Sequence, residues 1–366
     1  MTVHFILLIL SLVLLLFAVD KNKFQVPTII LFVVFFVLAF IFATFRDETI
    51  GNDTGGYVQF FQLSTLYDSF SSLLDITRFE PGYVLLNYIV SRFTDDYTVF
   101  FFVCNAIGFA CTIYFFRTYC LNKNAWPFLW LIWGTLYWSF SAVRAALAMC
   151  LLFLYFDAVL KNRLFRAIIW LLVAGSIHYS AFVCGIVLFL RLPVLQRIKK
   201  HKFLLVIGFL CIGIFLSKLM SFLPDAYSGY YTDSQWAEGG VRVASIMNFI
   251  FLGMTYLSSS INLNSRIKNI SSDVVSSWKY YYDFRSIFLV GFGFSFLELF
   301  FNQFNRIEMF FIPLISIYIV DSFRYVTLLK KIAIIILMTI VAIYQIYTFV
   351  IRPEWLSIFP YMFRSL

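Results

Sequence analysis

Long apolar runs follow one another along almost the whole chain, and they limit what it can fold into. A membrane-spanning helix needs about 20 consecutive apolar residues, and a soluble domain has no place to bury many such runs. Hydrophobic residues make up 62% of the 366 residues and charged residues only 13%, whereas an ordinary soluble domain carries about 25% charged residues. We therefore expect an all-α, polytopic membrane protein that forms a single integral membrane domain over residues 1–366.

The apolar runs predict about 11–12 transmembrane segments, because each span with its loop needs roughly 30 residues. The run at Val3–Val19 lacks the basic start and the cleavage site of a signal peptide, so we read it as a span. The run at Ala167–Leu190 is ambiguous, because its length alone does not say how many times it crosses the membrane. The remaining predicted spans are Val26–Phe45, Tyr97–Phe116, Trp126–Phe140, Ala145–Val159, Phe203–Leu223, Val243–Ile261, Ile287–Phe301, Ile307–Val320 and Ile332–Val350.

Basic residues give the spans an orientation. Lys and Arg cluster in alternate loops, and we expect these loops to be cytoplasmic. In a membrane protein such loops explain the net charge of +9, so the charge does not indicate nucleic-acid binding. Basic loops flank Ala167–Leu190 on both sides, so this run must enter the membrane and return. We expect a broken or re-entrant helical pair over residues 167–190, with its tip at Gly175–His178 towards the outer face, where irregular backbone faces protein or water.

The largest predicted extracytoplasmic loop covers residues 46–96. Tyr57–Leu66 and Tyr83–Phe93 within it are amphipathic, and both are expected to be interfacial helices. Before the first of them, Gly51–Gly56 reads as a turn whose Asp53 either caps the helix or faces a ligand together with the helix-start amides. Glu80, just before Pro81 and Gly82, is by default a helix-start acid and becomes a candidate base if it points into a cleft.

Three polar residues within apolar sequence are hard to explain as lipid-facing, because each would cost about 2–3 kcal/mol or more at depth. Arg144 either extends to the outer interface or lines a cavity, His178 is either a core histidine or a functional one, and Arg306 either pairs with Glu298 or Glu308 or binds a ligand. The charge bias places several such residues on the outer side, and arginines that converge there suit an anion such as pyrophosphate. These residues are Arg46, Asp53, Glu80, Arg144, His178, Arg242 and Arg306.

Metal and cofactor sites are not predicted. The chain has only three histidines, its six cysteines lie in or beside apolar runs without a CxxC pair, and no nucleotide-binding or hydrolase motif occurs. We therefore expect no metal ligands and no cofactor.

Five segments together resemble the EpsG-like group of Wzy-type polysaccharide polymerases. Their order and spacing extend over nearly the whole chain. One departure is that Ala145 follows Arg144, where members of the group often carry Gln. The segments are Arg46–Phe61 (RDETIGNDTGGYVQFF), Glu80–Val90 (EPGYVLLNYIV), Phe140–Ala148 (FSAVRAALA), Gly175–Phe182 (GSIHYSAF) and Asn305–Pro313 (NRIEMFFIP).

The resemblance implies a GT-C-like glycosyltransferase of the bacterial cytoplasmic (inner) membrane. It would polymerise undecaprenyl-diphosphate-linked oligosaccharide repeat units at the outer leaflet by inverting, metal-independent glycosyl transfer. The product would be an O antigen, a capsule or an exopolysaccharide, and a chain-length regulator protein would be a partner. Such chemistry needs cations for the departing diphosphate and a base for the acceptor hydroxyl. We assign the diphosphate to Arg144, Arg306 and Arg46, the base to Glu80, His178 or Asp53, and further substrate binding to Tyr57, Tyr83 and Arg242.

Two other functions compete with polymerisation. Another lipid-linked-sugar glycosyltransferase or a membrane acyltransferase would fit a similar number of spans, and an acyltransferase would place its histidine on the donor side of the membrane, often the cytoplasmic one. A transporter of lipid-linked oligosaccharides would show inverted repeats and charges near the bilayer midplane. No internal repeat is apparent in this sequence.

Overall fold

Helices make up the regular structure in the part of the chain that the computed structural model describes. That part comprises residues 2–19, 25–120, 123–189, 243–259, 281–300, 304–322, 326–347, 357, 358 and 360–364. Within it, the one β-type pairing is an isolated antiparallel bridge between Arg46 and Phe363. The prediction of an all-helical fold is therefore confirmed.

The chain divides into two units, Met1–Phe182 with Met338–Leu366 and Val183–Leu337. The helices that lie wholly in the first unit are α1 (Thr2–Val19), α2 (Gln25–Thr44), α3 (Thr54–Thr65), α4 (Phe70–Asp75), α5 (Pro81–Ser91), α6 (Tyr97–Tyr119), α7 (Trp126–Ile132), α8 (Thr135–Ser141), α9 (Val143–Leu160) and α10 (Leu164–Ile177). The second unit contains α11 (Ile186–Phe189), α15 (Val243–Ser259), α17 (Tyr281–Glu298), α18 (Asn305–Glu308) and α19 (Ile312–Ser322), and the division falls within the 3-10 helix η1 (Tyr179–Gly185) and within α20 (Leu328–Ile346).

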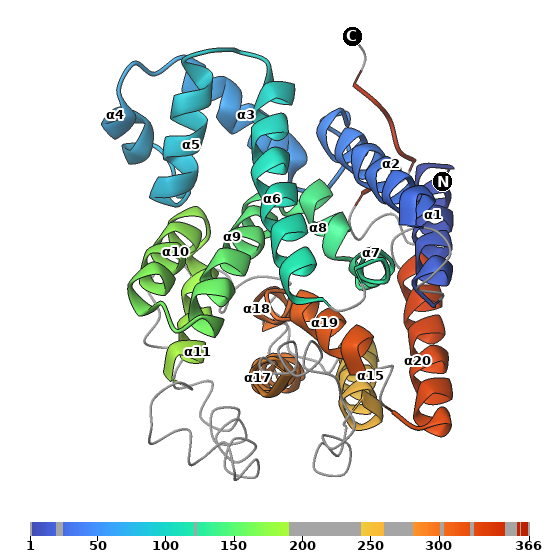
Figure 1. The fold of residues 1–366 in the computed structure, drawn as a ribbon. Coiled ribbons are helices and arrows are strands. Elements are labelled where there is room, and N and C mark those ends of the chain that lie inside the picture. The colour runs from blue at the N-terminus through green and yellow to red at the C-terminus, as the bar shows by residue number, and fades with distance from the viewer. Residues whose placement is uncertain are drawn as a thin grey trace. The chain divides into compact units, whose positions relative to one another are not determined.

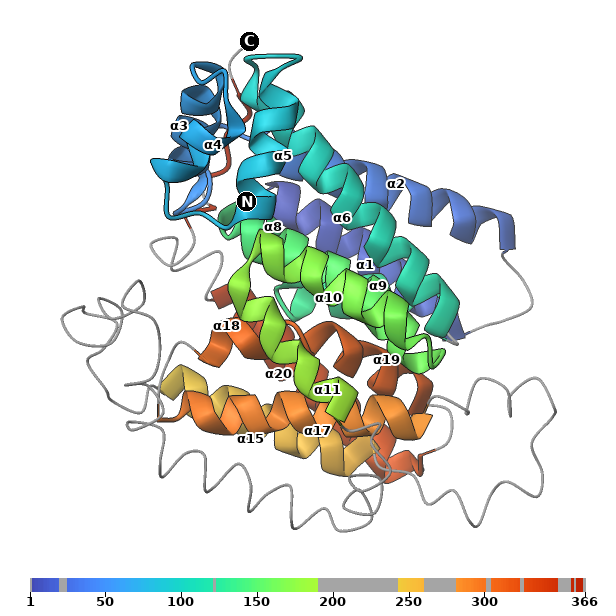
Figure 2. The same ribbon diagram turned by 90° about the vertical axis from the view of Figure 1, so that its left-hand side faces the viewer.

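Helix α9 is at the centre of the first unit. It packs against α6 on one side and α10 on another, while α2 packs against α6, as Figures 1 and 2 show from two directions. Aromatic rings fill the contact between α6 and α9, where Phe115 and Phe153 stack with their centroids 5.1 Å apart. Phe116 stacks on Trp126 of α7 at 4.5 Å. Offset stacking of this kind adds specific geometry to the hydrophobic packing.

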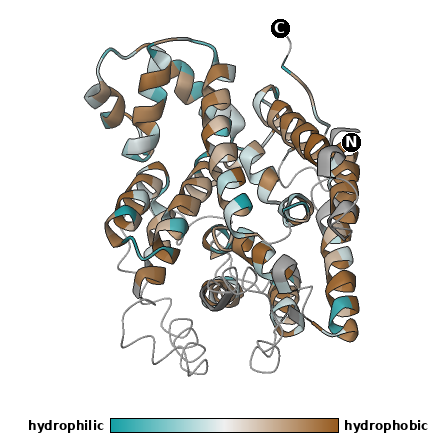
Figure 3. Cartoon of the chain, viewed as in Figure 1, coloured by the Kyte–Doolittle hydropathy of each residue, from teal (hydrophilic) through white to brown (hydrophobic). Residues whose placement is uncertain are grey.

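Apolar side chains also cover outward-facing surface of the first unit. On α2, Ile29, Ile30, Val33 and Val37 are each exposed by half or more, and Figure 3 shows α2 coloured as hydrophobic along its length. Helices α6 and α9 are each long and apolar enough to cross a membrane. Exposed apolar surface of this extent fits lipid and not water, and the protein is a membrane protein. The number of crossings and the GT-C-like topology stay predictions.

The predicted span Trp126–Phe140 is not one continuous helix. It consists of α7 and α8, which are separated at Trp133 and Gly134. Gly134 has φ of 72°, a left-handed conformation that ends a helix and that only glycine adopts without steric strain. Gly134 therefore divides this segment into two short helices of seven residues each.

The helix that enters residues 167–190 stops at the predicted tip. Helix α10 ends at Ile177, His178 has an extended backbone (φ −155°, ψ 114°), and the chain continues as η1. The re-entrant arrangement of this segment stays a prediction, as does its position near the outer face.

The segment at residues 46–96 folds into three short helices that pack on one another. Helix α5 contacts both α3 and α4, and α3 and α5 also contact α6. Phe61 of α3 stacks on Phe100 of α6 with a centroid distance of 5.1 Å. Two of these helices coincide with the amphipathic stretches of the sequence, while their interfacial position and their side of the membrane stay predictions.

A short segment near the end of the chain packs against residues from the end of α2 to the start of α6. We call residues 357, 358 and 360–364 the C-terminal strap. Ser357 O accepts a hydrogen bond from Gly51 N–H at 2.9 Å, and the Tyr361 hydroxyl donates to Phe42 O at 2.7 Å. The Arg364 guanidinium pairs with Asp96, at the start of α6. The C-terminal strap thus connects α2, the turn before α3 and α6.

Candidate active site

Glu80 occupies the position just before α5. Its backbone is extended (φ −65°, ψ 143°), as expected before a proline, and its side chain makes no capping bond to the helix. Gly82, in the first turn of α5, lies so close to Ser176 of α10 that a Cβ atom at this position would collide with it. The small residue lets the start of α5 approach the end of α10, which brings Glu80 next to His178.

The Glu80 carboxylate joins three segments of the chain. Arg144 Nη1 donates to Glu80 Oε2 at 2.5 Å, and His178 Nδ1 lies 2.9 Å from Oε1. The backbone N–H of Tyr179 donates to the same Oε1 at 3.2 Å. The side chain of Glu80 is 5% exposed, whereas those of His178 and Arg144 are 16% and 21% exposed. Two partly accessible basic groups are therefore held by one buried carboxylate.

The charge of Glu80 follows from these contacts. Burial alone would raise the pKa of Glu80, but the hydrogen bond from His178 and the positive charge of Arg144 outweigh burial and hold the pKa at about 2. An ionised carboxylate only accepts hydrogen bonds, so His178 Nδ1 carries the proton in this contact. When the ring is neutral, its lone pair is on Nε2, which is the atom available to accept a proton.

Arg144 projects from the first turn of α9 into an aromatic enclosure. Its guanidinium carbon lies 4.4 Å from the ring centroid of Phe79, 5.7 Å from that of Tyr57 and 5.8 Å from that of Tyr83. Tyr57 and Tyr83 are buried, at 4% and 0% exposure. Neither ring offers a free face for sugar stacking in this structure, and both act as walls around Arg144. The sequence analysis did not predict Phe79 as a site residue, and only its position next to Glu80 could have indicated that role.

Arg46 is completely buried, so its guanidinium does not reach a surface from which it could contact a substrate directly. Its guanidinium carbon lies 4.1 Å from the ring centroid of Phe101 and 5.9 Å from that of Phe140, and its Nη1 donates to Ala43 O. Burial lowers the pKa of Arg46 to about 10, which leaves it charged at neutral pH. Its charge also acts on Tyr57, which in turn interacts with Arg144. A role in assisting the diphosphate would therefore be an electrostatic one.

The other predicted site residues are not part of the Glu80 cluster as described. Asp53 is the exposed residue before α3 and makes no side-chain capping bond. Arg242 lies outside the described residues. Arg306 belongs to α18 in the second unit, so its convergence with Arg144 stays a prediction. Near it in sequence, Glu308 accepts hydrogen bonds from Asn248 Nδ2 at 2.8 and 2.9 Å.

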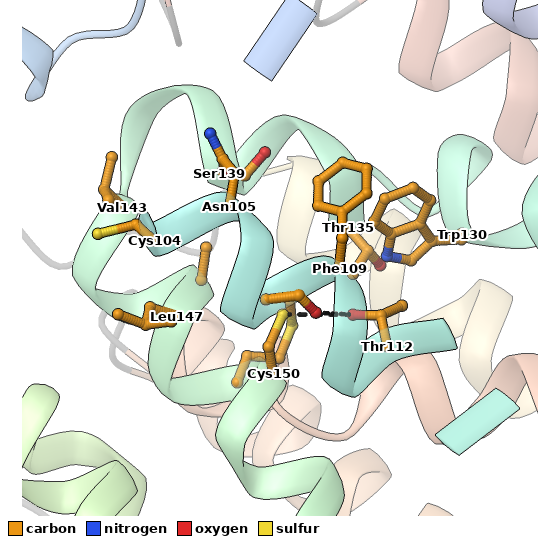
Figure 4. Close-up of a pocket in the computed structure, with 13 residues that line it drawn as sticks. Cys104, Asn105, Phe109, Thr112, Trp130, Thr135, Ser139, Val143, Leu147 and Cys150 are labelled. Carbon is orange, nitrogen blue, oxygen red and sulfur yellow. Dashed lines mark hydrogen bonds between the residues drawn. The ribbon is translucent and has the colours of Figure 1, made fainter. Parts of the chain in front are cut away.

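A cavity of about 20 Å³ lies between α6, α7, α8 and α9 (Figure 4), and Glu80, Arg144 and His178 are not among its lining residues. Its lining includes Asn105, Thr112, Trp130 and Cys150, and the Thr112 hydroxyl lies 3.4 Å from Cys150 Sγ. A volume of this size holds one water molecule, whereas small-molecule sites measure roughly 300–1,000 Å³. It is therefore too small for a sugar or a diphosphate.

Comparison with family models gives one match, to the EpsG family over residues 29–363. The chain belongs to the EpsG family. Comparisons with curated proteins and with solved structures found no match. Membership of the EpsG family supports a polysaccharide polymerase-like role in the membrane. Of the five segments that carried the resemblance, four supply residues to one site in the first unit, namely Tyr57, Glu80, Arg144 and His178.

Proposed function

We propose that this EpsG family protein polymerises undecaprenyl-diphosphate-linked oligosaccharide repeat units into a surface polysaccharide. The reaction takes place at the outer leaflet of the bacterial inner membrane by inverting glycosyl transfer, without a metal ion. The observation that supports this proposal most strongly is the cluster of Arg144, His178 and Glu80. It combines a cation for a departing phosphate with a histidine whose Nε2 can accept a proton while Nδ1 faces Glu80.

Arg144 binds the diphosphate of the donor chain. Departure of the diphosphate leaves negative charge on its oxygens, and a guanidinium fixed in low-dielectric surroundings stabilises that charge in the transition state. The aromatic enclosure of Phe79, Tyr57 and Tyr83 provides such surroundings and fixes the plane of Arg144. On the basis of the sequence we also assign Arg306 to the diphosphate, and Arg46 contributes positive potential, which acts on Tyr57 as well.

His178 is the general base, and Glu80 is a positioning residue that acts through it. Glu80 holds Nδ1–H, which directs Nε2 towards the acceptor and stabilises the imidazolium that forms. The acceptor hydroxyl gives its proton to Nε2 while its oxygen attacks the anomeric carbon. The bond from that carbon to the diphosphate breaks, and the electron pair leaves with the diphosphate. With a pKa of about 2, Glu80 is too weak a base for this step itself.

The test is complementation of a polymerase-deficient host with Arg144→Lys, Arg306→Lys and His178→Ala variants, followed by display of surface polysaccharide on a gel. Arg144→Lys and His178→Ala are expected to give single capped repeats in place of a ladder, because Lys lacks the planar fork of Arg and Ala has no proton acceptor. Arg92→Lys is the matched control. Arg92, just after α5, lies over Tyr88 and is not part of the Glu80 cluster, so this substitution is expected to leave the ladder intact.

Membrane levels of every variant are measured in the same samples. A full ladder from all three site variants at normal levels would show that the site is elsewhere in the protein. Loss of all surface carbohydrate, including the single repeats, would indicate a defect before polymerisation and would favour a transport role.

A further inference from the structure

We propose that Glu80 is a built-in competitor for the anion site, which holds Arg144 until a phosphate-bearing substrate displaces it. This inference rests on the proposed function, since it concerns the same arginine. Displacement frees Arg144 for the diphosphate and leaves Glu80 to His178. The site would then activate its base only when a donor is bound.

The two oxygens of Glu80 are held very differently. Oε1 accepts from His178 Nδ1 and from the backbone N–H of Tyr179, and both donors belong to the fixed turn at the end of α10. That turn is itself bonded, since His178 N–H donates to Ala174 O and Ala181 N–H donates to His178 O. Among the residues that the structure describes, Oε2 has one hydrogen-bond partner, Arg144 Nη1. The carboxylate is thus anchored on the His178 side, and Arg144 is the partner that can exchange.

Arg144 is also the more accessible partner of the pair. Its side chain is 21% exposed, against 5% for Glu80, so an incoming anion meets the guanidinium first. A guanidinium has five N–H donors, and its Nε is buried without a hydrogen-bond partner in the described structure. Arg144 therefore has unused donor capacity for a group with several oxygens. A diphosphate offers more negative charge than a single carboxylate and can bond a guanidinium at two points.

Exchange would couple binding to base strength. While Arg144 neutralises Glu80, the carboxylate gives less support to a positive charge on His178. Once the diphosphate neutralises Arg144, the full charge of Glu80 acts on the imidazolium that forms during proton transfer. Only an anion that engages Arg144 produces this change, so the site responds to the phosphate-bearing donor and not to a neutral sugar.

Competition makes a counterintuitive prediction for binding. If Arg144 is occupied by Glu80 most of the time, the apparent affinity for an anion is reduced by the fraction of Arg144 that is free. Glu80→Gln should therefore bind inorganic pyrophosphate about tenfold more tightly than the unchanged protein, although it should polymerise poorly. If Glu80 served only to support the local structure, its loss would weaken binding.

The experiment is titration of the purified full-length protein in detergent with inorganic pyrophosphate, followed by calorimetry. Glu48→Gln is the matched control, because it makes the same chemical change at an exposed position in the same segment, residues 46–96. It should leave the affinity within about twofold of the unchanged protein. The double variant Glu80→Gln with Arg144→Lys tests whether the gain depends on Arg144, and in this background the tightening should disappear.

A second variant guards against misfolding. Glu80 makes no helix-capping bond, so Glu80→Ala leaves the start of α5 without a lost cap, and protein of this variant that stays folded should bind pyrophosphate more tightly, as Glu80→Gln does. Unchanged or weaker pyrophosphate binding in monodisperse Glu80→Gln and Glu80→Ala protein would overturn the competition while leaving the diphosphate site intact. Pyrophosphate binding that does not change in Arg144→Lys alone would instead remove both the proposed diphosphate site and the competition.

Discussion

Gly82 offers a way to move the site without touching any residue in it. In Gly82→Ala, the new methyl group would lie 2.8 Å from Ser176 Cβ and 2.9 Å from Ser176 C, besides colliding with Oγ. Two of these atoms cannot rotate away, so α5 must shift from α10. Insertion of a methyl group into such packing lowers the free energy of unfolding by about 1–3 kcal/mol.

The same shift separates the groups that Glu80 joins. Glu80 comes from the start of α5 and contacts His178 and the Tyr179 N–H, which both follow α10. A displacement of about 1 Å can reduce catalysis by roughly 10²-fold when it misplaces reacting groups. We therefore expect Gly82→Ala to lose most polymer while the protein still reaches the membrane.

Gly56→Ala is the matched control for this change. Gly56 lies in α3, and a Cβ atom there meets nothing within 4 Å, so alanine is expected to stabilise the helix by up to about 1 kcal/mol. The assays are the length of the polysaccharide ladder in a complemented host and thermal unfolding of the purified proteins. Equal ladders from the two alanine variants at equal membrane levels would refute the role of the α5–α10 contact. Ser176→Ala should not rescue Gly82→Ala, because the Cβ and backbone clashes remain.

Three further predictions follow. The pKa of Glu80 is lowered from its ordinary 4.5 to about 2, so the ionised carboxylate stabilises the fold above pH 4.5. This contribution to the free energy of unfolding, on the order of 3 kcal/mol, is lost as the pH falls from about 4.5 to 2. Unfolding of Glu80→Gln should lack this pH dependence, and identical acid unfolding curves for the two proteins would contradict the prediction. Gly51→Ala should reduce stability by more than about 1 kcal/mol, because Gly51 has φ of 95° and a Cβ would strike Phe140 O; an unchanged unfolding temperature would argue against this close approach. Arg364→Ala should increase proteolysis of the C-terminal strap by releasing its ion pair with Asp96, and protease resistance equal to that of the unchanged protein would show that the pair is dispensable.

The sequence predicted the fold class and part of the site for a clear physical reason. The length and composition of the apolar runs indicate membrane helices whatever their packing, and polar residues within such runs are expensive unless they have partners. Arg144 and His178 were singled out on this basis, and Glu80 was a helix-start acid or candidate base in the loop at residues 46–96; the structure brings all three together. The break at Gly134 was also readable in principle, because glycine inside a helical pattern can end a helix.

The roles of these residues could not be read in the same way. Glu80 lies 64 residues from Arg144 and 98 from His178, and no local pattern says that one carboxylate will hold both. Sequence left Glu80 as a candidate base, whereas its partners make it an ionised anchor. Burial is likewise a property of the packed state, so the enclosed positions of Arg46 and Tyr83 became apparent only from the structure.

The C-terminal strap has a consequence for how the protein is made. Gly51, in the turn before α3, donates a hydrogen bond to Ser357 O, and Thr98, at the start of α6, accepts one from Arg364. In both pairs the partner in the C-terminal strap comes more than 250 residues later in the chain. A ribosome completes the helices around Glu80 long before these partners leave the exit tunnel. The segment that bears Glu80 can therefore make these contacts only after residues 357–364 have been synthesised, and a chain that stops before them would lack this closure.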